Sequence, residues 1–67
     1  MSIAKVTEIS ASSTSSFEDA IREGIERASE TLHNMRKVWI NEQSVIIRDD
    51  KIAEWHVNMR ITFVLDD

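Results

Sequence analysis

The chain has 67 residues, no cysteine and a net charge of −4, and its eight basic residues are scattered among twelve acidic ones. This composition excludes disulfides and thiolate zinc sites, and it argues against nucleic-acid binding, which needs a stripe of basic residues. No apolar run approaches the roughly 20 residues that span a bilayer and no signal-peptide pattern is seen, so we expect a single cytoplasmic domain over residues 1–67.

Residues 3–9, IAKVTEI, predict a short first strand, although Val6 and Ile9 do not alternate strictly and a bulge or bend would explain their spacing. The serine-rich stretch at 10–16, SASSTSS, predicts a polar connection to a helix. Backbone N–H groups of such a loop can hold a phosphate, but this one lacks the glycines and the lysine of a phosphate loop. We therefore favour a plain connection.

Residues 15–36 carry the only sustained helical period in the chain. The apolar face recurs at spacings of three and four and comprises Phe17, Ala20, Ile21, Gly24, Ile25, Ala28, Leu32 and Met35. Ser15, followed three residues later by Glu18, predicts a capping box at the start. Gly24 lies in a stripe of small residues with Ala20 and Ala28. Because glycine weakens a helix relative to alanine, we expect the helix to pack closely on a sheet at this point.

Residues 37–48 and 51–66 predict two long strands joined by a tight turn at Asp49-Asp50. If that turn is the whole loop, the expected opposing pairs are Val38–Ile61, Ile40–Met59 and Val45–Glu54. The predicted fold is α+β, with β-α-β-β order and a three-stranded antiparallel sheet wrapped around one helix.

The predicted sheet face turned away from the helix mixes large apolar residues with amides, a histidine and an arginine. By alternation it carries Lys37, Trp39, Asn41, Gln43, Val45 and Ile47 on one strand and Ile52, Glu54, His56, Asn58, Arg60, Thr62 and Val64 on the next. A solvated face would be polar throughout, so a contact is expected here. A chain this short buries only about 60% of its unfolded surface. Another subunit is therefore the favoured cover, and a ligand platform is compatible with it.

No catalytic constellation or metal site follows from this register. Glu42 and Glu54 fall on opposite faces, which argues against shared acid–base work. His56 has no evident companions that would complete a metal site. Trp39 opposes Arg60 on the outer face, where a cation–π contact, ligand stacking and interface packing all stay open.

The segments of the chain, taken in order, resemble a dodecin. The likeness covers nearly the whole sequence and rests on KVTEI, the serine loop running into SFEDAI, IERASETLHNMR, VWINEQ and VNMRITFVLD. The length and the β-α-β-β order match as well. The resemblance implies a hollow homododecamer that binds a flavin, either FMN or riboflavin, and stores or sequesters it without catalysis.

The resemblance also implies where the flavin binds. In dodecins the ring stacks between tryptophans of symmetry-related subunits, and a glutamine hydrogen-bonds the ring edge. Alignment without gaps places the stacking position at Lys37, the edge-binding position at His56 and a mid-strand ligand contact at Ser44. Trp39 lies two residues from Lys37 on the same face and can take over the stacking. No metal site is carried over, because a serine occupies the acidic position expected near the helix start.

Two functions follow from these observations. The leading hypothesis is a flavin-binding storage protein that assembles with copies of itself, is no enzyme, and has no nucleic-acid or membrane partner. The alternative is a structural homo-oligomer that has lost flavin binding or holds a different small ligand. Lys37 and His56 lie roughly 20 Å apart along the predicted ladder, so a common pocket requires two or more subunits.

Overall fold

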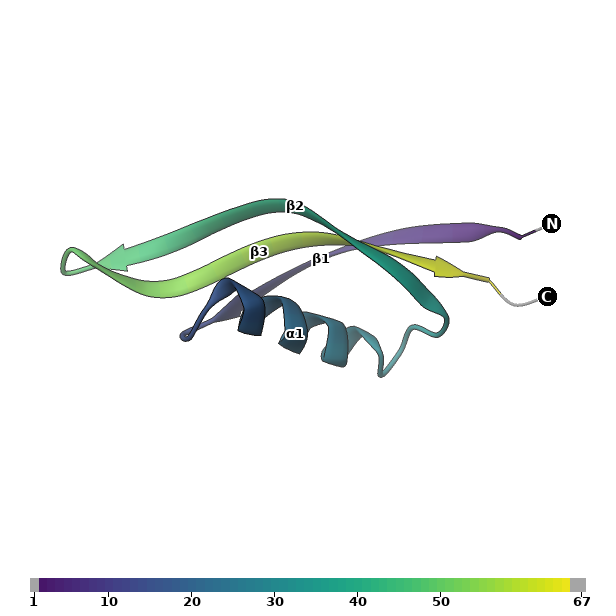
Figure 1. Cartoon of the computed structure of the whole chain (residues 1–67), viewed down its shortest axis with the longest axis horizontal. Helices are drawn as coiled ribbons and strands as arrows, with labels where there is room; N and C mark the ends of the chain where they lie inside the picture. Colours follow the sequence, from purple (N-terminus) through teal and green to yellow (C-terminus); the bar gives the residue numbers. More distant parts are fainter. Residues whose placement is uncertain (1, 66–67) are drawn as a thin grey trace.

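The computed structural model describes residues 2–65 as three strands and one helix: β1 (Ala4–Ser13), α1 (Phe17–Ala28), β2 (Met35–Arg48) and β3 (Lys51–Val64). The strands form one antiparallel sheet in the order β1-β3-β2, so the last strand lies in the middle. The helix lies along one face of this sheet (Figure 1). The α+β fold, its β-α-β-β order and its three-stranded antiparallel sheet are thereby confirmed.

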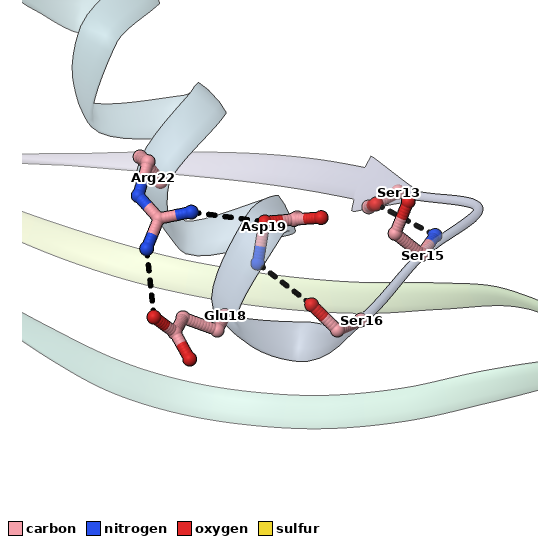
Figure 2. A network of polar contacts seen from close by, with 6 residues as sticks. All are labelled: Ser13, Ser15, Ser16, Glu18, Asp19 and Arg22. Carbon is pink, nitrogen blue, oxygen red and sulfur yellow. Dashed lines mark hydrogen bonds and ion pairs between the residues drawn. The ribbon is translucent and has the colours of Figure 1, made fainter.

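The helix starts directly after Ser16, whose Oγ accepts a hydrogen bond from the N–H of Asp19 at 3.0 Å (Figure 2). The prediction that Ser15 is the cap was therefore one residue too early. The N–H of Ser15 donates instead to the Oγ of Ser13, at 2.9 Å, in the loop before the helix. Arg22 lies one turn further on and pairs with Asp19 at 3.0 Å. The start of α1 is thus fixed by a side chain that satisfies a free backbone N–H group.

The helix ends at Ala28, well before the predicted end at residue 36. The N–H of Leu32 still donates to the carbonyl of Ala28 at 2.8 Å, but Asn34 has a φ of 61° and redirects the chain. Met35 then pairs with Phe63 and begins β2. Met35 matches the helical period but lies in β2, because pairing with β3 outweighs its local preference. Leu32 also matches that period but lies in the connection between α1 and β2.

The first strand is longer than predicted, because it runs to Ser13 instead of ending at residue 9. Ser10 to Ser13, which the sequence indicated as a loop, pair with residues 58 to 55 of β3. Since β3 has 14 residues, it offers partners to a long β1. In the other direction, β3 ends at Val64; Asp66, the predicted end of that strand, lies outside the described residues.

The hairpin between β2 and β3 has the predicted two-residue turn. Asp49 and Asp50 both have positive φ, 52° and 62°, as a tight hairpin turn requires. Arg48 pairs with Lys51 across it. Further along, the predicted pairs Val38–Ile61 and Ile40–Met59 are also confirmed.

Between these two regions the register differs from the prediction, because each strand contains an extra residue. Register shifts lie between Ile46 and Ile47 and between Ile40 and Glu42, which leaves Ala53 and Asn41 without direct partners. Val45 therefore opposes Trp55 and not Glu54. Because side chains alternate with a period of two, one extra residue exchanges the faces of the residues that follow it. The unbulged alternation therefore assigned the wrong faces on β2 from residue 42 onward, including Ile47, and on β3 to Ile52, the partner of Ile47.

The corrected faces follow from the observed pairs, because directly opposed residues share a face. Glu42 and Ser44 lie on the outer face, opposite Asn58 and His56 respectively. Gln43, which the sequence placed on that face, opposes Val57 of the helix-side core. Val45 likewise shares the helix side with its partner.

The core is thin and is concentrated where α1 crosses β3. Its buried residues are Ala20, Gly24 and Ala28 on the helix and Val57, Met59 and Ile61 on the strand. A Cβ atom added to Gly24 would lie 2.5 Å from Cε of Met59 and 3.1 Å from Cβ of Ala11. The stripe of small residues thus allows close packing of helix on sheet, as predicted.

The molecule is elongated, with extents of 52 × 19 × 13 Å. Its radius of gyration is 13.9 Å, whereas a compact chain of this length is expected near 11 Å. The end of the β2–β3 hairpin extends past the helix (Figure 1). Among residues 2–65, six large apolar side chains are exposed: Ile3, Val6, Trp39, Ile47, Ile52 and Leu65. Within residues 2–65, no helix has the length and apolar character needed to cross a membrane.

Candidate functional site

The candidate site lies on the outer face of the sheet, opposite the helix. Each rung of the sheet there carries one residue from each of the three strands. Three consecutive outer-face rungs are Glu8–Arg60–Trp39, Ser10–Asn58–Glu42 and Ser12–His56–Ser44. A ligand on this face would therefore meet an indole at one rung and amide, hydroxyl, carboxylate and imidazole groups at the next two.

Trp39 presents its indole to the surface, with 61% of the residue exposed. The ammonium of Lys37 lies 5.8 Å from the centre of the ring, which is cation–π distance. Arg60 opposes Trp39 in the ladder, but its Nε donates to Oε1 of Glu8 at 3.4 Å. The cation over the indole is therefore Lys37, a neighbour on the same strand, and not the cross-strand arginine that the sequence suggested.

A chain of amide and hydroxyl groups crosses all three strands at the next rung. Nδ2 of Asn41 donates to Oδ1 of Asn58 at 2.9 Å, and Nδ2 of Asn58 donates to Oγ of Ser10 at 3.0 Å. Asn41 is the extra residue of β2, so its side chain ties the bulge to the central strand. These bonds orient the amide of Asn58 on the outer face.

A shallow hollow of about 230 Å³ lies beside this chain of hydrogen bonds. Its lining consists of Ser10, Glu42, Ser44, His56, Val57 and Asn58. The lining is rich in groups that accept and donate hydrogen bonds, which suits the polar edge of a heterocyclic ring.

His56 is held at one side of the hollow by Glu54. Nε2 of His56 lies 2.9 Å from Oε1 of Glu54, and a guanidinium nitrogen of Arg48 lies 3.0 Å from Oε2 of the same carboxylate. Hydrogen bonds from His56 and then Arg48 hold the pKa of Glu54 below its ordinary value. The carboxylate thus fixes the orientation of the His56 ring toward the turn end of the sheet.

The four sequence-predicted site residues fall into two separate pairs. Ser44 and His56 oppose each other and both line the hollow. Lys37 and Trp39 contact each other further along the sheet. Lys37 opposes Thr62, six positions along β3 from His56, a separation of about 20 Å at ~3.3 Å per residue. One chain does not bring all four together, so a shared pocket needs residues from neighbouring subunits.

The sequence missed Ser10 and Glu42 as lining residues of the hollow. Ser10 was assigned to a loop, and Glu42 was assigned to the face opposite Glu54. The bulge at Asn41 in fact puts Glu42 and Glu54 on the same face, although four positions of β3, about 13 Å, still separate them. No group of three or more His, Asp or Glu side chains within residues 2–65 is arranged to hold a metal ion.

The geometry of the chain matches known structures closely. The family model for dodecin matches residues 3–66. The dodecin from Streptomyces davaonensis is 39% identical, with a TM-score of 0.93 over 98% of this chain and 97% of that one. A variant of the dodecin from Thermus thermophilus has a TM-score of 0.95 at 24% identity and full coverage of both chains, which shows the fold alone.

One further similar structure concerns a different ligand. The calcium dodecin from Mycobacterium tuberculosis, described as a calcium-chelating antigen with a novel calcium-binding site, is 25% identical with a TM-score of 0.82. The alignment covers 96% of this chain and 91% of that one. The comparison with curated proteins found no match.

Proposed function

The chain belongs to the dodecin family, and from this premise we propose that it binds a flavin, FMN or riboflavin, and stores or sequesters it without catalysis. The proposed assembly is a hollow homododecamer in which the outer sheet faces of neighbouring subunits meet. The flavin pocket would be built from Lys37, Trp39, Ser44 and His56 of more than one subunit.

The observation that carries the proposal is the exposed indole of Trp39. An indole with 61% of its residue exposed leaves a large aromatic surface in water, which is unfavourable unless something covers it. A planar flavin ring stacked on it would bury that surface. The polar hollow at His56 and Ser44 would supply hydrogen bonds for the ring edge of a flavin held by another subunit.

The shape of the subunit supports the assembly. The hairpin projects past the helix and leaves Ile47 and Ile52 exposed near its end. An isolated two-stranded hairpin is marginal in water. Contacts with neighbouring copies would cover these side chains and stabilise both strands.

A second candidate is an assembled shell that has lost flavin binding or holds another small ligand. Lys37 favours it, because a lysine at the stacking position offers no ring. The calcium-binding relative also indicates that flavin is not the sole ligand in this family.

A fluorescence titration of riboflavin and of FMN, with the mass of the protein measured alongside, distinguishes the two. Flavin binding predicts strong quenching at a fixed stoichiometry, lost in Trp39→Ala while the mass of the assembly is retained. Trp55→Phe is the matched control, because Trp55 lies on the helix side opposite Val45; that variant should still quench. An intact assembly that quenches neither flavin supports the second candidate.

A further inference from the structure

The hollow at His56 is lined by an acidic side chain and by no lysine or arginine, which affects the kind of flavin it can bind. Of its six lining residues, Glu42 carries a carboxylate and none is lysine or arginine. A glutamate is negatively charged at neutral pH. We propose that Glu42 makes this hollow select an uncharged flavin over a phosphorylated one. The inference rests on the proposed flavin binding and names the class of flavin.

The arginines described near the hollow are engaged by acids, and Lys37, the other cation of the proposed pocket, lies 5.8 Å from the centre of the Trp39 ring and does not line the hollow. Arg48 pairs with Glu54 at 3.0 Å, and Nε of Arg60 donates to Glu8 at 3.4 Å. His56 itself lies 2.9 Å from Glu54. A phosphate entering this part of the outer face would therefore meet the carboxylate of Glu42 before an uncommitted guanidinium.

The bulge in β2 determines which side chain occupies this position. Because Asn41 is an extra residue, Glu42 lies opposite Asn58 on the outer face, and its uncharged neighbour Gln43 turns to the helix side. The hydrogen bond from Asn41 to Asn58, at 2.9 Å, holds the bulge in place. The carboxylate is thus built into the hollow by the backbone and does not depend on a side-chain rearrangement.

The physical basis of the selection is long-range repulsion. A phosphate monoester carries about −1.5 to −2 charges at neutral pH, whereas riboflavin carries none. Charges near a protein surface act on each other over a Debye length, about 10 Å at 0.1 M salt. Ser44 lies opposite His56 and Glu42 lies opposite Asn58, two positions along the strand, or about 7 Å at ~3.3 Å per residue. A flavin whose ring edge is held in this hollow therefore lies within a Debye length of Glu42.

Dissociation constants of riboflavin and FMN, measured on the assembled protein at low and high salt, test the proposal. The native protein should prefer riboflavin by about tenfold or more at low salt. The preference should shrink at ~0.5 M salt, where screening is strong. Glu42→Gln should reduce the preference for riboflavin by lowering the dissociation constant of FMN. Ser44→Lys, which adds a cation opposite His56, should reduce the preference further. Glu26→Gln removes the same charge from the exposed surface of α1 and should leave the ratio unchanged.

Two outcomes overturn the inference in different ways. Glu42 does not select the ligand if FMN binds the native protein as tightly as riboflavin. The same conclusion holds if the ratio of the two dissociation constants in Glu42→Gln and in Ser44→Lys equals that of the native protein. In both cases the proposal of flavin binding stands. If neither flavin binds an assembly of full mass, the proposed function fails together with the inference. The nearly isosteric Glu42→Gln change at an exposed position keeps the test independent of folding, and the mass of each variant verifies this.

Discussion

Among single residues, Glu54 connects the turn end of the sheet to the candidate site. One of its oxygens binds His56, which lines the hollow, and the other binds Arg48 next to the turn. Both partners favour the ionised carboxylate, so its pKa lies below the ordinary value of 4.5. A carboxylate whose pKa is lowered by folding stabilises the fold above its unfolded pKa, and that stabilisation is lost as the pH falls through the folded pKa.

Glu54→Gln should therefore lower the melting temperature at pH 7 but not in strong acid. Above about pH 4.5 the native protein has the full ionic contribution of this carboxylate, and below the lowered pKa it has none. Melting curves of both proteins, recorded from pH 7 down to the most acidic pH at which both still fold, measure the difference, which should narrow as the pH falls below 4.5 and through the lowered pKa. A difference that stays constant over this range would show that the charge of Glu54 does not matter.

At the scale of secondary-structure elements, strong local signals in the sequence predicted the elements and their pairing, whereas the bulges could not be predicted. The Asp49-Asp50 turn fixed the hairpin, and with it the pairs Val38–Ile61 and Ile40–Met59. The bulge at Asn41 contains no glycine or proline, so composition does not reveal it, and the outer-face position of Glu42 could not be foreseen. The end of α1 was missed for another reason: pairing of β2 with β3 competes with a helical period that continues in the sequence.

The packing of α1 on the sheet depends on the absence of a side chain at Gly24. Gly24→Ala would improve helix propensity by about 1 kcal/mol. However, the added Cβ would lie 2.5 Å from Cε of Met59 and 3.1 Å from Cβ of Ala11. Overpacking of this kind costs about 1–3 kcal/mol, so we expect a net loss of stability in chemical unfolding.

A double-mutant cycle separates the two effects. Met59→Leu removes the atom closest to the added Cβ, so combining it with Gly24→Ala should recover part of the loss. Glu23→Ala, at the exposed neighbouring position, is the control and should change stability little. A gain in stability for Gly24→Ala alone would mean that the helix can move away from β3 at no cost.

At the scale of the whole molecule, the chain by itself is extended and leaves large apolar side chains exposed. Its radius of gyration of 13.9 Å exceeds the roughly 11 Å of a compact chain of this length. Outside its small core, large apolar side chains are exposed at both ends and on the outer face. The four predicted site residues occupy two places about 20 Å apart on the sheet. Folding, assembly and completion of a pocket are therefore expected to depend on one another.

Placing a charge on the hairpin end should weaken the assembly. Ile52 is 48% exposed near the turn, and in the proposed homododecamer it would be buried, where an unpaired lysine is costly. Ile52→Lys should lower the assembled mass in sedimentation velocity and make the melting temperature rise with protein concentration. Thr14→Lys, in the exposed loop before α1, is the control. A full-mass assembly for Ile52→Lys would place the hairpin end outside the subunit contacts.

The strand order has a consequence for how the chain is made. β1 pairs with β3 alone, and β3 is the last element of the described chain. During synthesis, β1 therefore has no strand to pair with until the ribosome has produced residues 51–64. Before then, the helix has no complete sheet on which to pack. Since pairing between distant segments is slow to form, the subunit is expected to fold only after β3 has left the ribosome, with its apolar strands open to other nascent chains in the meantime.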